Sequence, residues 1–241
     1  MGRKSNIALI FFLGVFLFSC HSNQKGKKIT LFEKLQKSKG YLNSSELKKL
    51  DYDYSLKLLD QYDFSGYDEE DTLAYFVRSG SYIWVASCYI GDNDNPFFCL
   101  KETKEKQFKM VQHGIIPVVF GECEYELDRL LTLVGKTIIV SQKSSGNGYC
   151  DDKPLIFHAD GKMVLFEDRI HLISRACSED KEMIFCFERD FKYSLENKLL
   201  SVHVKEKKID QESEQVINYQ EYDLRYSLAH NFLKFKDTLR N

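Results

Sequence analysis

The segment RACSEDKEMIFCFERD, residues 175–190, places two cysteines in strand-like runs on either side of a charged centre. If this segment folds as a symmetric hairpin, Cys177 and Cys186 lie directly opposite each other. Directly opposed residues of antiparallel strands are about 4.5–5.5 Å apart, which is within reach of a disulfide. The segment therefore predicts two antiparallel strands joined by a disulfide.

A second segment, WVASCYIGDNDNPFFCLK at residues 84–101, has the same form, with two apolar runs around a turn-rich centre. A symmetric hairpin centred on Asn93 and Asp94 would bring Cys88 opposite Cys99. A slip of one residue in the pairing would place the two cysteines on opposite faces of the sheet. The pairing of Cys88 with Cys99 is therefore an expectation that depends on the register.

The chain has seven cysteines, and six remain if Cys20 is set aside for the reason given below. An even number in an exported protein is typical of disulfides. The six candidates are Cys88, Cys99, Cys123, Cys150, Cys177 and Cys186. Cys123 and Cys150 would pair by elimination if the two hairpins form. The alternative is that all six are ordinary buried thiols, since free cysteine is among the most buried residue types.

Helical spacing is confined to about residues 30–62. Thr30 and Glu33 have the spacing of a capping box that opens a short helix, which Gly40 would close. Asn43 or Ser44 would cap a second helix. The apolar stripe of this second helix consists of Leu47, Leu50, Tyr54 and Leu58.

Strand patterns dominate from about residue 72 to residue 225, as short runs rich in aromatic and β-branched residues bounded by Gly, Asn, Asp and Pro. Residues 122–136 fit a helix better, and residues 143–153 fit a loop. The predicted fold class is α+β, with a short N-terminal helix pair and a mostly antiparallel β body, which is a sandwich, a barrel or a curved sheet. Residues 29–241 would form a single globular domain.

The N-terminus begins with basic residues, Arg3 and Lys4, and continues as an apolar run from Ile7 to Phe18. A helix of this length rises about 18 Å, which is short of the roughly 30 Å of a bilayer core. A charged start before a short apolar run is typical of a secretory signal peptide.

The end of that run, Leu17-Phe18-Ser19-Cys20, resembles the lipobox of bacterial lipoproteins. The resemblance implies that residues 1–19 are a signal peptide and that Cys20 is acylated and becomes the new N-terminus. Residues 20–28 would form a lipidated tether, and His21 after the cysteine favours the outer membrane over the inner membrane. Several acyl chains hold a protein stably on a membrane. The alternative is a plain secretory signal in which Cys20 is incidental.

Composition supports a folded body, with 43% hydrophobic and 14% aromatic residues. Cleavage would remove Arg3 and Lys4 from the 34 basic residues, which leaves 32 against 36 acidic ones. This balance argues against a nucleic-acid partner, which requires a concentrated basic face.

No motif specifies a reaction, a metal or a cofactor. The Asp92–Pro96 stretch fails the calcium-loop pattern, and no paired CxxC motif suggests zinc. The best candidates for partner binding are small polar residues and a tyrosine of the predicted loop, since such loops often carry function. These candidates are Ser144, Ser145, Asn147 and Tyr149.

The sequence therefore favours a lipid-anchored cell-envelope protein that binds a protein or a glycan, rather than an enzyme. One alternative is an envelope hydrolase whose active site forms only in three dimensions. Others are a toxin-neutralising protein of the immunity type or a structural lipoprotein. An enzyme would show a pocket of convergent polar groups with perturbed pKa values, and a binder would show an exposed apolar patch.

Overall fold

A computed structural model of the chain describes residues 30–57, 66–87, 94–117, 126–146, 149–166, 170, 172–180, 183–210, 212–229 and 232–240. The predicted signal peptide (residues 1–19) and the predicted tether with Cys20 (residues 20–28) lie outside these ranges. The described chain is mostly antiparallel β, with strands arranged in three sheets and few helical residues.

Sheet A is a five-stranded antiparallel meander in the order β1-β2-β3-β4-β5. Its strands are β1 Lys39–Asn43, β2 Thr72–Ser79, β3 Tyr82–Ser87, β4 Asp94–Glu102 and β5 Phe108–Pro117. The middle strands β2 and β3 are nearly continuous apolar runs, because both faces of the sheet are covered.

Sheet B is a three-stranded antiparallel sheet in the order β10-β7-β6. Its strands are β6 Leu131–Val134, β7 Thr137–Val140 and β10 Leu155–His158. Every residue of β7 is buried, and its side chains alternate between two cores. Ile138 packs with Trp84 of sheet A, whereas Ile139 packs on the other side.

Sheet C has eight strands in the order β11-β16-β15-β14-β13-β12-β9-β8. Its strands are β8 Lys143–Gly146, β9 Tyr149–Asp152, β11 Leu165–Phe166, β12 Leu172–Asp180, β13 Met183–Glu196, β14 Leu199–Asp210, β15 Val216–Ala229 and β16 Phe232–Arg240. Only β11 and β16 pair in parallel among these strands. The long β14 alternates buried and half-exposed residues, which is the pattern of a sheet covered on one face.

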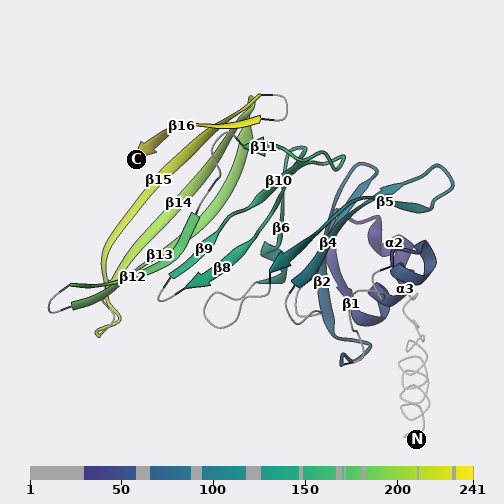
Figure 1. Ribbon diagram of the computed structural model, residues 1–241, viewed down its shortest axis with the longest axis horizontal. Helices are drawn as coiled ribbons and strands as arrows, with labels where there is room; N and C mark the ends of the chain where they lie inside the picture. Colours follow the sequence, from purple (N-terminus) through teal and green to yellow (C-terminus); the bar gives the residue numbers. More distant parts are fainter. Residues whose placement is uncertain are drawn as a thin grey trace, which may run out of the picture.

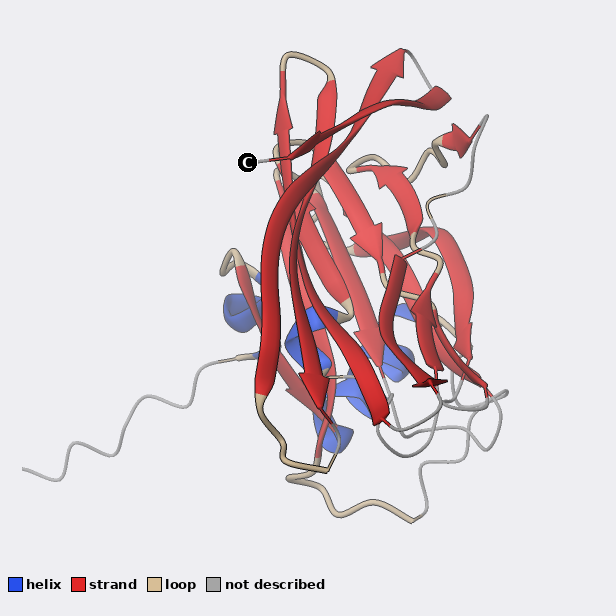
Figure 2. Cartoon of the chain, turned by 90° about the vertical axis from the view of Figure 1, so that its left-hand side faces the viewer, coloured by secondary structure: helices blue, strands red, loops and turns tan. Residues whose placement is uncertain are grey.

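The elements stack in layers, with sheet B in the middle. One core joins the helices to sheet A, a second joins sheet A to sheet B, and a third joins sheet B to sheet C. The long strands β13, β14 and β15 curve along one side of the molecule, and the helices lie at the opposite side (Figure 1). Seen from the side of these strands, sheet C curls across the front with the helices behind it (Figure 2).

Two helices lie near the start of the described chain, and both begin with capping boxes. Helix α2, Leu31–Leu35, is capped by Thr30 and Glu33, as the sequence predicts. Helix α3, Ser44–Tyr54, is capped by Asn43 and Glu46. The apolar stripe of α3 is buried against sheet A, with Leu47 and Leu50 at 1% and 0% exposure.

The region differs from a simple helix pair in two ways. Strand β1 lies between the helices, and Gly40, expected to end the first helix, is in this strand. A Cβ at Gly40 would lie 2.8 Å from Cε1 of Phe76, so glycine allows the close packing of β1 on β2. Helix α3 ends at Tyr54 rather than near residue 62, because Ser55 has a left-handed backbone with φ of 51°.

The expected helix at residues 122–136 is wrong for its described part. That part contains a single 3-10 turn, η2 Leu127–Arg129, followed by β6. The alternating residues of β6 and the positive φ of Gly135 (61°) build a hairpin with β7. The β region also extends to Arg240, beyond the predicted end at residue 225.

The expected loop at residues 143–153 is also wrong for its described part, residues 143–146 and 149–153. It forms β8 and β9, which pair with each other, and β9 pairs with β12. Backbone hydrogen bonds of a ladder do not require apolar side chains, so small polar residues can occupy these strands. An Asn-Gly pair at residues 147 and 148, between two short runs, is a hairpin signal that the loop assignment overlooked.

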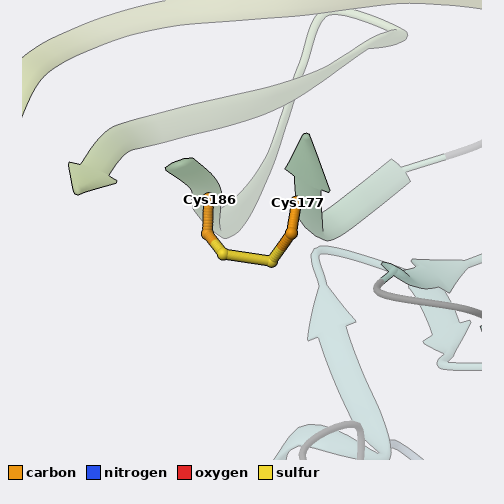
Figure 3. Close-up of a disulfide and its surroundings, with 2 residues drawn as sticks. All are labelled: Cys177 and Cys186. Atoms are coloured by element: carbon orange, nitrogen blue, oxygen red, sulfur yellow. A yellow bond between two sulfur atoms is a disulfide. The ribbon is translucent and has the colours of Figure 1, made fainter. Parts of the chain in front are cut away.

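The disulfide between Cys177 and Cys186 is confirmed (Figure 3). The two residues are directly opposed in the β12–β13 ladder, with Cα atoms 4.1 Å apart. Cys150 is also disulfide-bonded, and Cys123, its predicted partner, lies outside the described residues.

The predicted disulfide between Cys88 and Cys99 is wrong, because Cys99 is a buried free thiol. In the β3–β4 ladder Cys99 lies opposite Trp84, whereas Cys88 lies outside the described residues. Burial raises the pKa of the Cys99 thiol to about 12. The register differs from the symmetric hairpin by four residues, and an even shift leaves every side chain on its predicted face.

Candidate functional site

Sheet C is split between β12 and β13, and the split forms the candidate site. The ladder between these strands ends where Arg175 pairs with Glu188. Beyond this point β12 continues to Leu172 against β9, while β13 continues to Glu196 against β14. Across the split, Nη1 of Arg189 donates a hydrogen bond of 3.1 Å to the carbonyl oxygen of Ile173.

Two cavities open at the split, with volumes of about 370 and 430 Å³. They share the residues that define what we term the split-sheet cleft, namely Arg129, Lys143, Ser174, Arg189, Asp190 and Lys205. These residues come from η2, β8, β12, β13 and β14. Because Arg189 and Asp190 are neighbours in β13, side chains from both faces of this strand line the cleft.

Basic residues predominate in the first cavity. Its lining has six basic residues, Arg129, Lys143, Arg175, Arg189, Lys205 and Lys207. The acidic residues of the same lining are Glu126, Glu188 and Asp190. The lining therefore has three more basic than acidic residues, whereas the whole chain has a formal net charge of −2. A concave, positively charged lining attracts anions.

A buried ion pair fixes one wall of the cleft. Nε of Arg189 on β13 pairs with Oε2 of Glu206 on β14, and Nε2 of Gln220 on β15 donates a hydrogen bond to Oε1 of Glu206. The side chain of Glu206 is 7% exposed and that of Arg189 is 20% exposed. The carboxylate therefore orients the guanidinium, leaving one edge of it toward Ile173 and the split.

The rim of the cleft holds more exposed ion pairs. Nε of Arg129 lies 2.8 Å from Oε2 of Glu126, and Nη1 of Arg129 lies 3.9 Å from Oδ1 of Asp190. Nζ of Lys205 lies 2.9 Å from Oε1 of Glu221. Exposed pairs of this kind stabilise a fold only slightly, so these cations can exchange their partners for a ligand anion at small cost.

Lys143 and Asp152 are opposed in the β8–β9 ladder and line the second cavity, where Asp152 is buried and Lys143 is half-buried. Burial lowers the pKa of Lys143, against the opposing charges of Asp152 and Glu126. Burial also raises the pKa of Asp152, although this carboxyl accepts hydrogen bonds from Ser141 Oγ at 2.7 Å and from the Gln142 amide at 2.8 Å. Burial therefore disfavours both the charged ammonium form of Lys143 and the charged carboxylate form of Asp152. A bound anion would favour protonation of both, so anion binding should tighten as the pH falls.

Tyr193 lines the second cavity, together with Phe191 and Thr132. Burial raises the pKa of Tyr193 well above its ordinary value, and the nearby Asp152 and Tyr226 act in the same direction. The phenol therefore remains protonated near neutral pH. Thr132, Ser141 and Ser174 add hydroxyl groups to this lining, and Phe191 and Tyr193 add aromatic rings.

The residues that the sequence proposed for partner binding lie close to the cleft in the chain. Ser144 and Ser145 are in β8, directly after Lys143, and Tyr149 begins β9. Asn147 lies outside the described residues. The structure thus places the predicted loop at the edge of sheet C next to the cleft, as a hairpin.

The residues of the cleft itself were not predicted from the sequence. Arg129 and Lys205 are 76 positions apart in the sequence, and no local motif joins them. One signal was present. On β14, Lys205 and Lys207 alternate with Val204 and Glu206, and this alternation predicts a strand with both lysines on one face.

A separate hollow of about 460 Å³ lies at the opposite end of sheet B, near the β6–β7 turn. Its lining includes Tyr82, Lys136, His158 and Asp160. This hollow is larger than either cavity of the cleft, but it has one lysine and one aspartate and therefore no excess of charge. We rank the cleft first because charge and buried titratable groups coincide there.

The described part of the chain contains no group of three His, Cys, Asp or Glu side chains that would hold a metal ion. Within the same residues, no helix has both the length and the apolar character needed to cross a bilayer.

Comparisons with known proteins returned nothing. No protein-family model, no curated protein and no solved structure matches this chain.

Proposed function

We propose that the protein is a lipid-anchored cell-envelope protein that binds an anionic partner, a protein or a glycan, through the split-sheet cleft. The anchor is Cys20, after the signal peptide of residues 1–19, and residues 20–28 are the tether. Because His21 follows the cysteine, the outer membrane is the favoured location.

One observation carries the binding role. Six basic residues from five separate elements line a cavity of about 370 Å³ in a chain whose net charge is negative. Cavities of this size are typical of ligand sites, and fixed charges in a concave site raise both the rate and the selectivity of anion binding. The buried pair of Arg189 and Glu206 supports the role, because it holds one cation in place before a ligand arrives.

Affinity capture from solubilised membranes tests the binding role. The bait is the full-length chain, compared with an Arg129→Ala/Lys205→Ala variant and with Lys109→Ala as the matched control. Lys109 is an exposed lysine of β5, in a different sheet. We expect one stoichiometric anionic partner with the wild type and the control, and its loss with the double variant. Recovery of no partner, or equal recovery with all three baits, would contradict the proposal.

The anchor is tested separately by Cys20→Ala. The variant should lose its acyl chains and leave the membrane fraction, since a single apolar run of this length does not span a bilayer. Undiminished pelleting with membranes would count against lipidation.

A hydrolase is the second candidate, because one observation favours it. Asp152 is a buried carboxyl with a raised pKa beside Lys143, whose pKa is lowered, and both line the second cavity. Groups perturbed in this way are typical of acid–base pairs in active sites. Asp152→Asn keeps the shape of the side chain and removes its titratable proton. The variant should therefore abolish any turnover that the wild type shows in a screen of envelope substrates. Turnover that survives in Asp152→Asn would reject Asp152 as the acid.

A further inference from the structure

We propose that the ligand of the split-sheet cleft is a linear acidic glycan that contacts both cavities. This inference rests on the proposed function and names the chemical class of the partner. It follows from the spacing of the cations, from the acids set among them, and from the rings and hydroxyls beside them.

The cations of the cleft come from five elements and line two cavities that share six residues. Lys205 and Lys207 are two residues apart on β14, a separation of about 6.7 Å between their Cα atoms. Arg129, Lys143 and Arg189 continue the lining from three other elements into the second cavity. A single compact anion can contact only part of this array. A ligand with repeated negative charges can contact all of it.

The acidic residues of the cleft discriminate between classes of polyanion. Glu126, Glu188 and Asp190 lie among the cations, and a carboxylate can only accept hydrogen bonds. Polyphosphate carries acceptors and no donors, so it is repelled by these three groups. An acidic glycan carries carboxylates for the cations and hydroxyl donors for the carboxylates. It therefore satisfies both kinds of group.

The second cavity adds features that suit a sugar ring. Phe191 and Tyr193 line it together with Thr132 and Ser174, so apolar ring faces lie beside hydroxyl groups. A sugar ring presents the same mixture of C–H and O–H groups. An extended acidic peptide carries carboxylates but no hydroxyl groups on its acidic side chains, so it offers fewer donors to Glu126, Glu188 and Asp190.

The test measures binding of defined probes to the full-length lipidated protein in nanodiscs by isothermal titration calorimetry. The probes are a dimer, a tetramer and a hexamer of galacturonate, the methyl-esterified hexamer, polyphosphate and poly-glutamate. We expect affinity to rise from the dimer to the hexamer, and to be lost on esterification. Lys205→Ala should weaken hexamer binding by about tenfold, and Lys109→Ala should leave it unchanged.

A second variant separates recognition of hydroxyls from attraction by charge. Glu188 is exposed, so Glu188→Gln should not affect folding, which an unchanged circular dichroism spectrum would verify. We expect this variant to bind the galacturonate hexamer more weakly and polyphosphate more tightly. If Glu188→Gln binds both the hexamer and polyphosphate more tightly, the Glu188 carboxylate does not accept hydrogen bonds from sugar hydroxyl groups, and the glycan assignment is wrong.

The outcomes distinguish this inference from the proposed function. If polyphosphate or poly-glutamate binds more tightly than the hexamer and Lys205→Ala weakens that binding, the anion site stands and the glycan assignment fails. If no probe binds, or Lys205→Ala has no effect on any probe, both fail. Tightest binding of the hexamer, dependent on Lys205, supports both.

Discussion

The ion pair between Arg189 and Glu206 should contribute more to stability than any other ion pair described in the chain. Replacing Arg189 with Met keeps the length of the side chain and leaves the Glu206 carboxylate, 7% exposed, without its cation. Breaking a buried pair from one side costs about 3–5 kcal/mol. Arg189 is 20% exposed and Gln220 still donates a hydrogen bond to Glu206, so we expect the lower end, about 3 kcal/mol.

Urea unfolding followed by tryptophan fluorescence measures this loss. The chain has one tryptophan, Trp84, which is fully buried between sheets A and B, so its emission reports on the core. With a slope of about 2 kcal/mol per molar urea, a loss of about 3 kcal/mol lowers the midpoint by about 1.5 M. Arg225→Met is the matched control, because its pair with Asp237 is more exposed, and it should lower the midpoint far less.

The double variant Arg189→Met/Glu206→Met identifies the cause of the loss. Replacing both members of a buried pair with apolar residues is often neutral, so the double variant should recover most of the stability lost by the single one. If Arg189→Met unfolds at the same urea concentration as the wild type, the pair does not stabilise the wall of the cleft. If the double variant is as unstable as the single one, an uncompensated charge is not the cause.

Three further predictions concern the core and the cleft. Gly114→Ala should destabilise the protein by about 1–3 kcal/mol, because its Cβ would overlap the ring of Phe97, whereas Gly66→Ala, with open space around it, should have little effect in the same urea titration. Cys99 should resist maleimide in the native protein at pH 8 and react after unfolding, since burial raises its pKa to about 12, and rapid native labelling would contradict its burial. Anion affinity should fall as the pH rises through the lowered pKa of Lys143, because the amine loses its charge there. Lys143→Arg keeps its charge at higher pH, so calorimetric titrations of this variant should show a weaker dependence of affinity on pH. An unchanged pH dependence in the variant would exclude Lys143 as the titrating group.

Local signals in the sequence predicted the parts of the fold that depend on neighbouring residues. Thr30 and Asn43 cap helices because each has a glutamate three positions later, and this spacing can be read directly. Cys177 and Cys186 face each other because a short hairpin fixes its own register. These contacts need no knowledge of the rest of the chain.

Register and sheet membership depend on distant contacts, and there the sequence was insufficient. The β3–β4 hairpin places Cys99 opposite Trp84, because both pack into the core between sheets A and B. The turn residues alone favoured a hairpin centred on Asn93 and Asp94, which would have placed Cys99 opposite Cys88. Leu131 and Leu133 fit a helix or a strand, and pairing of β6 with β7 decided between them.

The cleft could not be predicted for the same reason. It exists because the β12–β13 ladder stops at Arg175 and Glu188, and no residue in either strand marks that point in the sequence. Only the meeting of η2, β8 and β13 brings Arg129, Lys143 and Arg189 to one cavity. The alternation of lysines on β14 is the one part of the site that local sequence encodes.

Hydrogen–deuterium exchange of the full-length protein, with and without the galacturonate hexamer, tests the central claim most directly. We expect slower exchange at residues 127–129, 172–175 and 189–193, which border the split in sheet C. We expect no change in β1 and β2 of sheet A. Protection confined to the hollow at Gly80 and Asp160, or no protection anywhere, would contradict the assignment of the cleft as the binding site of an acidic glycan.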